Sequence, residues 1–200
     1  MDGVTESDWL LISVNTAAAS ASLRVTVWRK LKALGALYLH QSVCVLPVRA
    51  STRRAVSALA ERVTQGGGKV RTLSIRITDP DHEASLRDEL RSARDDEYNE
   101  VLQRFPTFFE ELETETARGR TTFEELEESE ADLARFRGWL GKIDARDYFT
   151  APLGERARAE LARADEAIAA FAELAIASHD TAPSAEEETT RLRAVRRRRT

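Results

Sequence analysis

The first 78 residues alternate between short apolar runs and amphipathic stretches, and this order of elements constrains the fold most strongly. Runs typical of strands cover residues 9–14, 36–39, 43–46 and 69–77. Apolar residues at helical spacing occur over residues 20–34 and about 51–65. The order strand, helix, strand, strand, helix, strand is typical of the ferredoxin-like plan, in which two helices cover one face of a four-stranded antiparallel sheet.

Capping and breaking residues predict where these elements end. Ser20 or Ser22 is expected to cap the first helix, and Gly35 is expected to end it. Ser51 is expected to cap the second helix. Pro47 is expected to end the third strand, because proline has no amide hydrogen for a β-ladder.

Beyond residue 78 the sequence is typical of long helices, predicted over residues 79–104, 108–118, 122–142 and 155–178. Residues 179–200 lack apolar periodicity and are expected to be disordered. We therefore predict an α+β protein in three parts: a ferredoxin-like domain over residues 8–78, a mainly helical domain or arm over 79–178, and a tail over 179–200 that ends in an arginine-rich segment.

Several classes of protein are disfavoured by composition. Charged residues make up 32% of the chain, and no apolar run of 18 residues exists, so no membrane association is expected. The first eight residues, MDGVTESD, lack the basic start of a secretory signal. A single cysteine cannot form an internal disulfide. We expect a cytoplasmic protein.

Candidate catalytic and metal-binding residues are few. The three histidines, His40, His82 and His179, do not have the spacing of a metal site, and Cys44 is better interpreted as a small buried residue than as a ligand paired with His40. Motifs for a nucleophile, a phosphate loop, a flavin or a nicotinamide are absent from the sequence. We therefore expect no enzymatic activity and no cofactor. The acidic runs 110–115 and 124–132 are typical of solvated helix faces, or of contacts with the basic face of a partner.

Charge is strongly segregated along the chain. Residues 1–78 contain 11 Lys or Arg and four Asp or Glu, whereas residues 83–135 contain seven basic and 17 acidic residues. Basic clusters neutralise phosphates of nucleic acids or attract small oxyanions, although an ordinary solvated surface is an equal alternative. The candidate DNA- or oxyanion-binding residues are Arg24, Arg29, Lys30, Lys32, Arg53 and Arg54. The six arginines within residues 191–200 are either an arm that binds nucleic acid or a solubilising end.

Two long strings resemble one known family. WLLISVNTAAASASLRVTVWRKLKALGALYLHQSVCVLP (residues 9–47) and ETARGRTTFEELEESEADLARFRGWLGKIDARDYF (residues 115–149) are similar to the N-terminal region of the ChrB family of chromate-resistance proteins. The resemblance implies a protein of the chromate response, since members are described as regulators of a chromate-efflux operon. Full-length members continue into a second domain. Within the matching helix, Trp28 is interpreted as a packing residue.

A fainter similarity is to the ferredoxin-like domains of phenylacetate-type repressors and of CRISPR adaptation nucleases. Those nucleases carry an acidic metal ligand at the end of the first strand. The corresponding residues here are Val14, Asn15 and Thr16, which argues against metal-dependent cleavage.

The leading hypothesis is therefore a DNA-binding transcription regulator that responds to chromate or a related oxyanion and forms a homodimer through an exposed sheet edge or its long helices. One alternative is an accessory protein in chromate tolerance that binds no DNA and acts through protein contacts of its acidic helices. Another is a chromate reductase, which would need an electron source for which no motif is visible.

Overall fold

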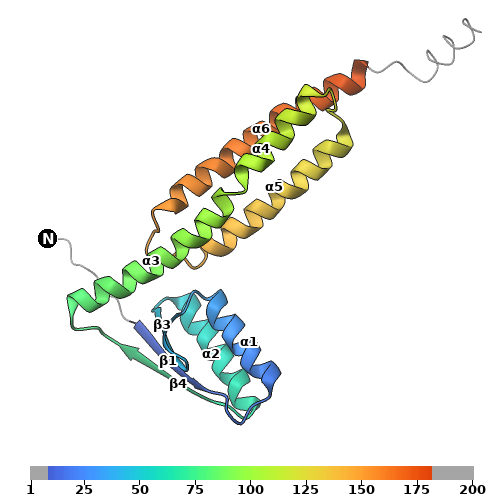
Figure 1. The fold of residues 1–200 in the computed structure, drawn as a ribbon. Coiled ribbons are helices and arrows are strands. Elements are labelled where there is room, and N and C mark those ends of the chain that lie inside the picture. The colour runs from blue at the N-terminus through green and yellow to red at the C-terminus, as the bar shows by residue number, and fades with distance from the viewer. Residues whose placement is uncertain (1–8, 182–200) are drawn as a thin grey trace, which may run out of the picture. The chain divides into compact units, whose positions relative to one another are not determined.

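The computed structural model describes residues 9–181 of the chain. One antiparallel sheet, with strand order β2-β3-β1-β4, is formed by β1 (Trp9–Asn15), β2 (Leu37–His40), β3 (Val43–Pro47) and β4 (Lys69–Ile75). Two helices, α1 (Ala21–Ala33) and α2 (Ala50–Gln65), lie side by side on one face of this sheet (Figure 1). The strand order and the pairing are those of the ferredoxin-like plan, so the predicted α+β fold is confirmed.

The alternation of side chains along β1 supplies apolar residues to both faces of the sheet. Leu10 and Ile12 point to the helix side, where they pack in one cluster with buried residues of β3, α1 and α2: Val27, Leu31, Cys44, Leu46, Val56, Leu59 and Val63. The apolar residues at helical spacing thus form the inner faces of both helices.

The opposite face of the sheet is covered in part by a later segment of the chain. Trp9 and Val45 form a buried cluster with Leu90 of α3 (Pro80–Leu102), and Phe149 packs against it. The Trp9 and Phe149 ring centroids lie 5.7 Å apart. The contacts of Trp9 with Leu90 and Phe149 thus attach α3 and the segment around Phe149 to the unit that contains the sheet.

Helix ends follow the predicted signals at α1 but not at α2. The Ser20 hydroxyl accepts a hydrogen bond from the Leu23 amide (3.2 Å), and Gly35 has a φ of 70° after the helix. The prediction that Ser51 caps the second helix is wrong, because Arg49 is the N-cap residue. Thr52 in the first turn replaces a capping side chain: its hydroxyl accepts from the Arg49 amide and donates to the Pro47 carbonyl, each at 2.9 Å. Pro47 ends β3 as predicted.

The helices after α3 are α4 (Phe105–Ala117), α5 (Phe123–Asp144) and α6 (Leu153–Thr181), which run side by side (Figure 1). Helix α4 begins earlier than predicted, because Pro106 lies in its first turn, where a missing amide hydrogen is tolerated. Helix α6 reaches Thr181, so the expected disorder is wrong for residues 179–181. The remainder of that tail, with its arginines, lies outside the described residues.

The chain divides into two compact units. The described part of the first comprises residues 9–98 and 141–154, and that of the second comprises residues 99–140 and 155–181. The first unit thus extends beyond the predicted boundary at residue 78, since α3 and the segment around Phe149 pack on the sheet. Within residues 9–181, no helix is both long enough and apolar enough to cross a membrane.

Candidate functional site

The predicted basic residues all lie on the surface of the first unit. Arg24, Arg29, Lys30 and Lys32 are exposed on α1, while Arg53 and Arg54 are exposed in the first turns of α2. None of these six side chains forms an ion pair with another described residue. Their charge is therefore available to a ligand.

Five exposed residues of α1 follow helical spacing in two adjacent rows. Arg24, Trp28 and Lys32 are spaced four residues apart, so they share one side of the helix. Val25 and Arg29 lie beside them, again four residues apart. We call these five residues the α1 stripe. Lys30 lies on the other flank of the buried Val27 and Leu31 and is outside the stripe.

The cations of α2 lie near the end of α1. Because α1 follows β1 and α2 follows the antiparallel β3, the two helices run in opposite directions on the sheet. The start of α2, with Arg53 and Arg54, is therefore beside the C-terminal end of α1. The structure thus brings the two predicted groups of cations onto one side of the unit.

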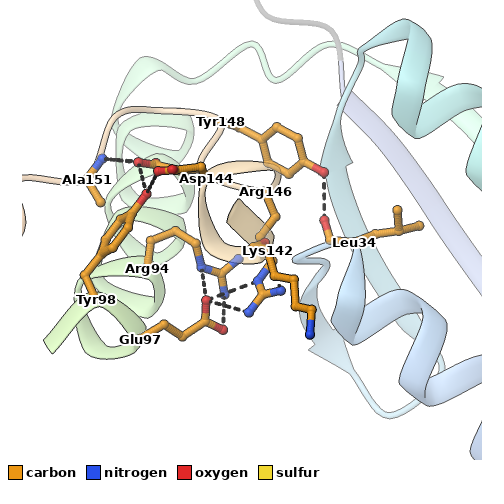
Figure 2. A network of polar contacts seen from close by, with 10 residues as sticks. Leu34, Arg94, Glu97, Tyr98, Lys142, Asp144, Arg146, Tyr148 and Ala151 are labelled. Carbon is orange, nitrogen blue, oxygen red and sulfur yellow. Dashed lines mark hydrogen bonds and ion pairs between the residues drawn. The ribbon is translucent and has the colours of Figure 1, made fainter. Parts of the chain in front are cut away.

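Near the C-terminal end of α1 lies a second group of arginines, of which Arg94 is buried and Arg146 is partly buried (Figure 2). The Glu97 carboxylate lies between two guanidinium groups: its Oε2 atom is 3.0 Å from Arg94 Nε and 2.9 Å from Arg146 Nη2. The Arg94 side chain is only 8% exposed. We call Arg94, Glu97 and Arg146 the arginine clamp.

The arginine clamp and its neighbour Tyr148 contact the last residues of the α1 segment. The Tyr148 hydroxyl donates a hydrogen bond to the Leu34 carbonyl at 2.8 Å (Figure 2). A β-carbon at Gly35 would lie 2.5 Å from Arg94 Nη1 and 3.1 Å from Arg146 Cβ. Gly35 has a φ of 70°, which glycine adopts without strain, so its place at the end of α1 suits both the backbone and the neighbouring arginine clamp.

Burial determines the titration of these groups. It lowers the pKa of Arg94, and the nearby Glu97 carboxylate opposes that shift. Burial also raises the pKa of Tyr148. Among the described residues, Arg94 Nη1 has no hydrogen-bond partner, so Arg94 depends on Glu97 for compensation.

Tyr98, another buried residue of α3, ties the 141–154 segment to that helix. Its hydroxyl donates a hydrogen bond to the Asp144 carboxylate at 2.7 Å and lies at hydrogen-bond distance, 3.2 Å, from the Asp147 carboxylate. The Asp147 carboxylate also accepts a hydrogen bond from the Ala151 amide at 3.0 Å. Burial and these carboxylates raise the pKa of Tyr98. The same segment supplies Arg146 and Tyr148, so Tyr98 supports the arginine clamp indirectly.

The acidic runs line a cavity in the second unit. Its volume is about 510 Å³, and its floor includes the apolar residues Phe108, Leu112 and Phe171. The acidic residues at its wall are Glu111, Glu115, Glu125, Glu128 and Asp132. These runs are thus partly a concave surface rather than only a solvated helix face.

Cys44 lies in the core of the first unit. The Cys44 thiol is 1% exposed and faces the helix-side core, and burial raises its pKa to about 11. The interpretation of Cys44 as a small core residue is confirmed. Within residues 9–181, no three His, Cys, Asp or Glu side chains are grouped so as to hold a metal ion.

Two features of the site were missed or misread from the sequence. Trp28 was interpreted as packing, yet its side chain is 51% exposed. The arginine clamp carried no signal, because Arg94 and Glu97 lie in α3 whereas Arg146 lies after α5, 49 residues from Glu97. The one signal in the sequence for the exposure of Trp28 was its position four residues from both Arg24 and Lys32. This spacing places Trp28 among cations rather than among the apolar residues of the helix.

Comparison with known proteins gives one consistent family. The sequence profile of a family described as "Protein ChrB, N-terminal" matches residues 24–182. Protein ChrB of Cupriavidus metallidurans (strain ATCC 43123 / DSM 2839 / NBRC 102507 / CH34) is 31% identical over 158 residues, which are 78% of this chain and 44% of that protein. The chain therefore matches less than half the length of this relative. No solved structure matches the chain.

Proposed function

Because this chain belongs to the ChrB family of chromate-resistance proteins, we propose that it is a transcription regulator that binds DNA through α1 and the start of α2 and responds to chromate or a related oxyanion. The observation that carries the proposal is the exposure of six cations on α1 and the start of α2 without an ion-pair partner among the described residues. Such a surface neutralises phosphates and releases their counterions. The proposal places the protein in the cytoplasm and assigns it no catalytic step.

The proposed assembly is a homodimer. Strands β2 and β4 are the two edges of the sheet, and an unpaired edge offers backbone groups to a second copy. A twofold dimer would place two copies of the basic surface on one DNA, so the two half-sites would be related by symmetry. Light scattering on the protein alone gives the mass that tests this part.

The test of DNA binding is fluorescence anisotropy with DNA from upstream of the protein's own gene and with scrambled DNA of the same length. We expect tighter binding to the upstream DNA, a steep loss of affinity as salt rises, and a change of affinity when chromate is added. Equal binding to both DNAs would argue against operator recognition. Absence of binding at low salt would overturn the proposal.

A matched pair of variants locates the surface. The double variant R29E/K32E reverses two cations of α1, whereas R104E/R156E makes the same change in net charge on the second unit. We expect R29E/K32E to lower the salt dependence, with a loss of about 0.9 in the slope of log K against log salt for each phosphate contact removed. The control is expected to keep the slope of the natural protein.

A second candidate function is favoured by the acid-lined cavity of the second unit. Its lining carries five carboxylates beside apolar residues and a single cation, Arg135, which pairs with Asp132. This excess of negative charge suits a basic segment of another protein. In that case the chain would be an accessory protein in chromate tolerance that binds no DNA. If reversing the charges of Glu125 and Glu128 abolishes binding of a partner protein, and R29E/K32E leaves that binding unchanged, this function is favoured over the first.

A further inference from the structure

Trp28 leaves half of its indole in solvent although it lies in the middle of a helix. Its side chain is 51% exposed, and Val25, one turn earlier, is 45% exposed. The core side of α1 is formed by Val27 and Leu31, and Trp28 lies beside it. An apolar patch on the outer side of a packed helix indicates a contact surface rather than a defect of packing.

The surroundings of the patch are cationic. Arg24 and Lys32 lie one turn before and one turn after Trp28, and the Lys32 amine is 5.2 Å from the ring centroid. Arg29 adjoins them, and the sequence of α1 contains no acidic residue. A second copy docked here by a twofold axis would bring these like charges together, which opposes association. Nucleic acid fits better, because it offers both negative charge and planar apolar faces.

We propose that Trp28 stacks on a base of the bound nucleic acid while the cations of the α1 stripe pair with the surrounding phosphates. The inference rests on the proposed function and adds a contact to it that is not electrostatic. Phosphate contacts weaken as salt rises, whereas stacking does not depend on counterion release. The two contributions therefore separate in a salt titration.

The experiment measures affinity for the upstream duplex and for one of its strands at several salt concentrations. We expect W28A to weaken binding about tenfold at every salt concentration, without a change of slope. The effect is expected to be larger on the single strand, whose bases are accessible. W28F keeps an aromatic face and is expected to retain most of the affinity. L174A removes a side chain of a residue that is 44% exposed on α6 of the second unit and is the matched control.

A fluorescence measurement shows whether the indole itself is in contact. In a W139F background the remaining tryptophans are Trp28 and Trp9, and Trp9 is fully buried. Quenching of the solvent-exposed emission on addition of DNA would therefore report Trp28. A melting curve of W28A is expected to match that of the natural protein, since the removed side chain is half exposed.

The outcomes separate this inference from the function on which it rests. If R29E/K32E weakens binding but W28A does not and the emission stays constant, stacking is wrong and DNA binding stands. If the natural protein binds neither strand nor duplex at low salt, both are wrong. If W28A changes the mass measured by light scattering, the patch joins two copies of the chain and stacking is again wrong.

Discussion

Two groups of basic residues lie at the same helix and differ in almost every physical respect. The cations of the α1 stripe are exposed and have no ion-pair partner among the described residues. Arg94 and Arg146 lie near the C-terminal end of α1, and both are paired with the single carboxylate of Glu97. The first group suits a ligand that arrives from solvent, whereas the second holds the helix in place.

The difference shows why a count of cations does not identify a binding surface. Sequence reasoning selected the cations of α1 and α2 because they cluster within about 30 residues. It passed over Arg94 and Arg146, which are far apart in the chain. A buried charge is retained only with compensation, so its removal affects folding first. An exposed charge contributes little to folding and is free to contribute to binding.

The largest expected effect is on the arginine clamp. E97A leaves Arg94 and Arg146 without their shared carboxylate, and loss of one partner of a buried pair destabilises by about 3–5 kcal/mol. The triple variant R94M/E97L/R146M replaces all three charges with apolar side chains and is expected to recover most of that loss. Urea unfolding measures both. E89A, on the exposed side of α3, is the matched control and is expected to change stability by less than about 0.5 kcal/mol. Equal effects of E97A and E89A would show that the arginine clamp does not support the fold.

A second expected effect is the dependence of stability on alkaline pH, to which the buried Cys44 thiol contributes. The Cys44 thiol has an ordinary pKa of 9.0 when unfolded and a pKa of about 11 when folded, because burial disfavours the thiolate. Its contribution to stability is therefore complete below pH 9 and is lost as the pH rises toward 11. At pH 10 the loss is on the order of 1 kcal/mol.

The control for this prediction is C44A, which has no thiol to titrate. The difference in unfolding free energy between the natural protein and C44A is expected to shrink between pH 7 and pH 10. A constant difference would show that the thiol is more accessible than its 1% exposure implies. Slow alkylation of the native protein at pH 8 checks the same burial independently.

Much of the fold was predictable from local signals, and the residues show why. The helical spacing of Leu23, Val27, Leu31 and Leu34 and the turn at Gly35 specify α1 without reference to the rest of the chain. The cap of α2 was not predictable in this way, because Thr52 works through a contact with the carbonyl of Pro47. The role of Glu97 depends on Arg146, which only the folded chain brings near. Exposure of Trp28 is likewise a tertiary property.

A smaller effect is expected at the contact that joins the arginine clamp region to α1. Y148F removes the hydrogen bond to the Leu34 carbonyl, which is 2.8 Å long, and leaves the aromatic packing in place. Loss of one such hydrogen bond destabilises by about 1 kcal/mol. Amide hydrogen exchange in the last turn of α1 is expected to become faster than exchange in α2. Uniform acceleration across the unit would indicate a general loss of stability instead of release of α1.

The smallest expected effect closes the comparison between the two groups. R29E/K32E changes the net charge of α1 by four units. Its unfolding free energy is nevertheless expected to lie within about 0.5 kcal/mol of that of the natural protein. The reason is that neither side chain is buried or forms an ion pair among the described residues. Any change should shrink as salt is raised, since exposed charges are screened. Urea unfolding at low and high salt measures it. A loss comparable to that of E97A would mean that Arg29 and Lys32 maintain the fold, and a loss of DNA binding in the same variant would then no longer identify them as contacts.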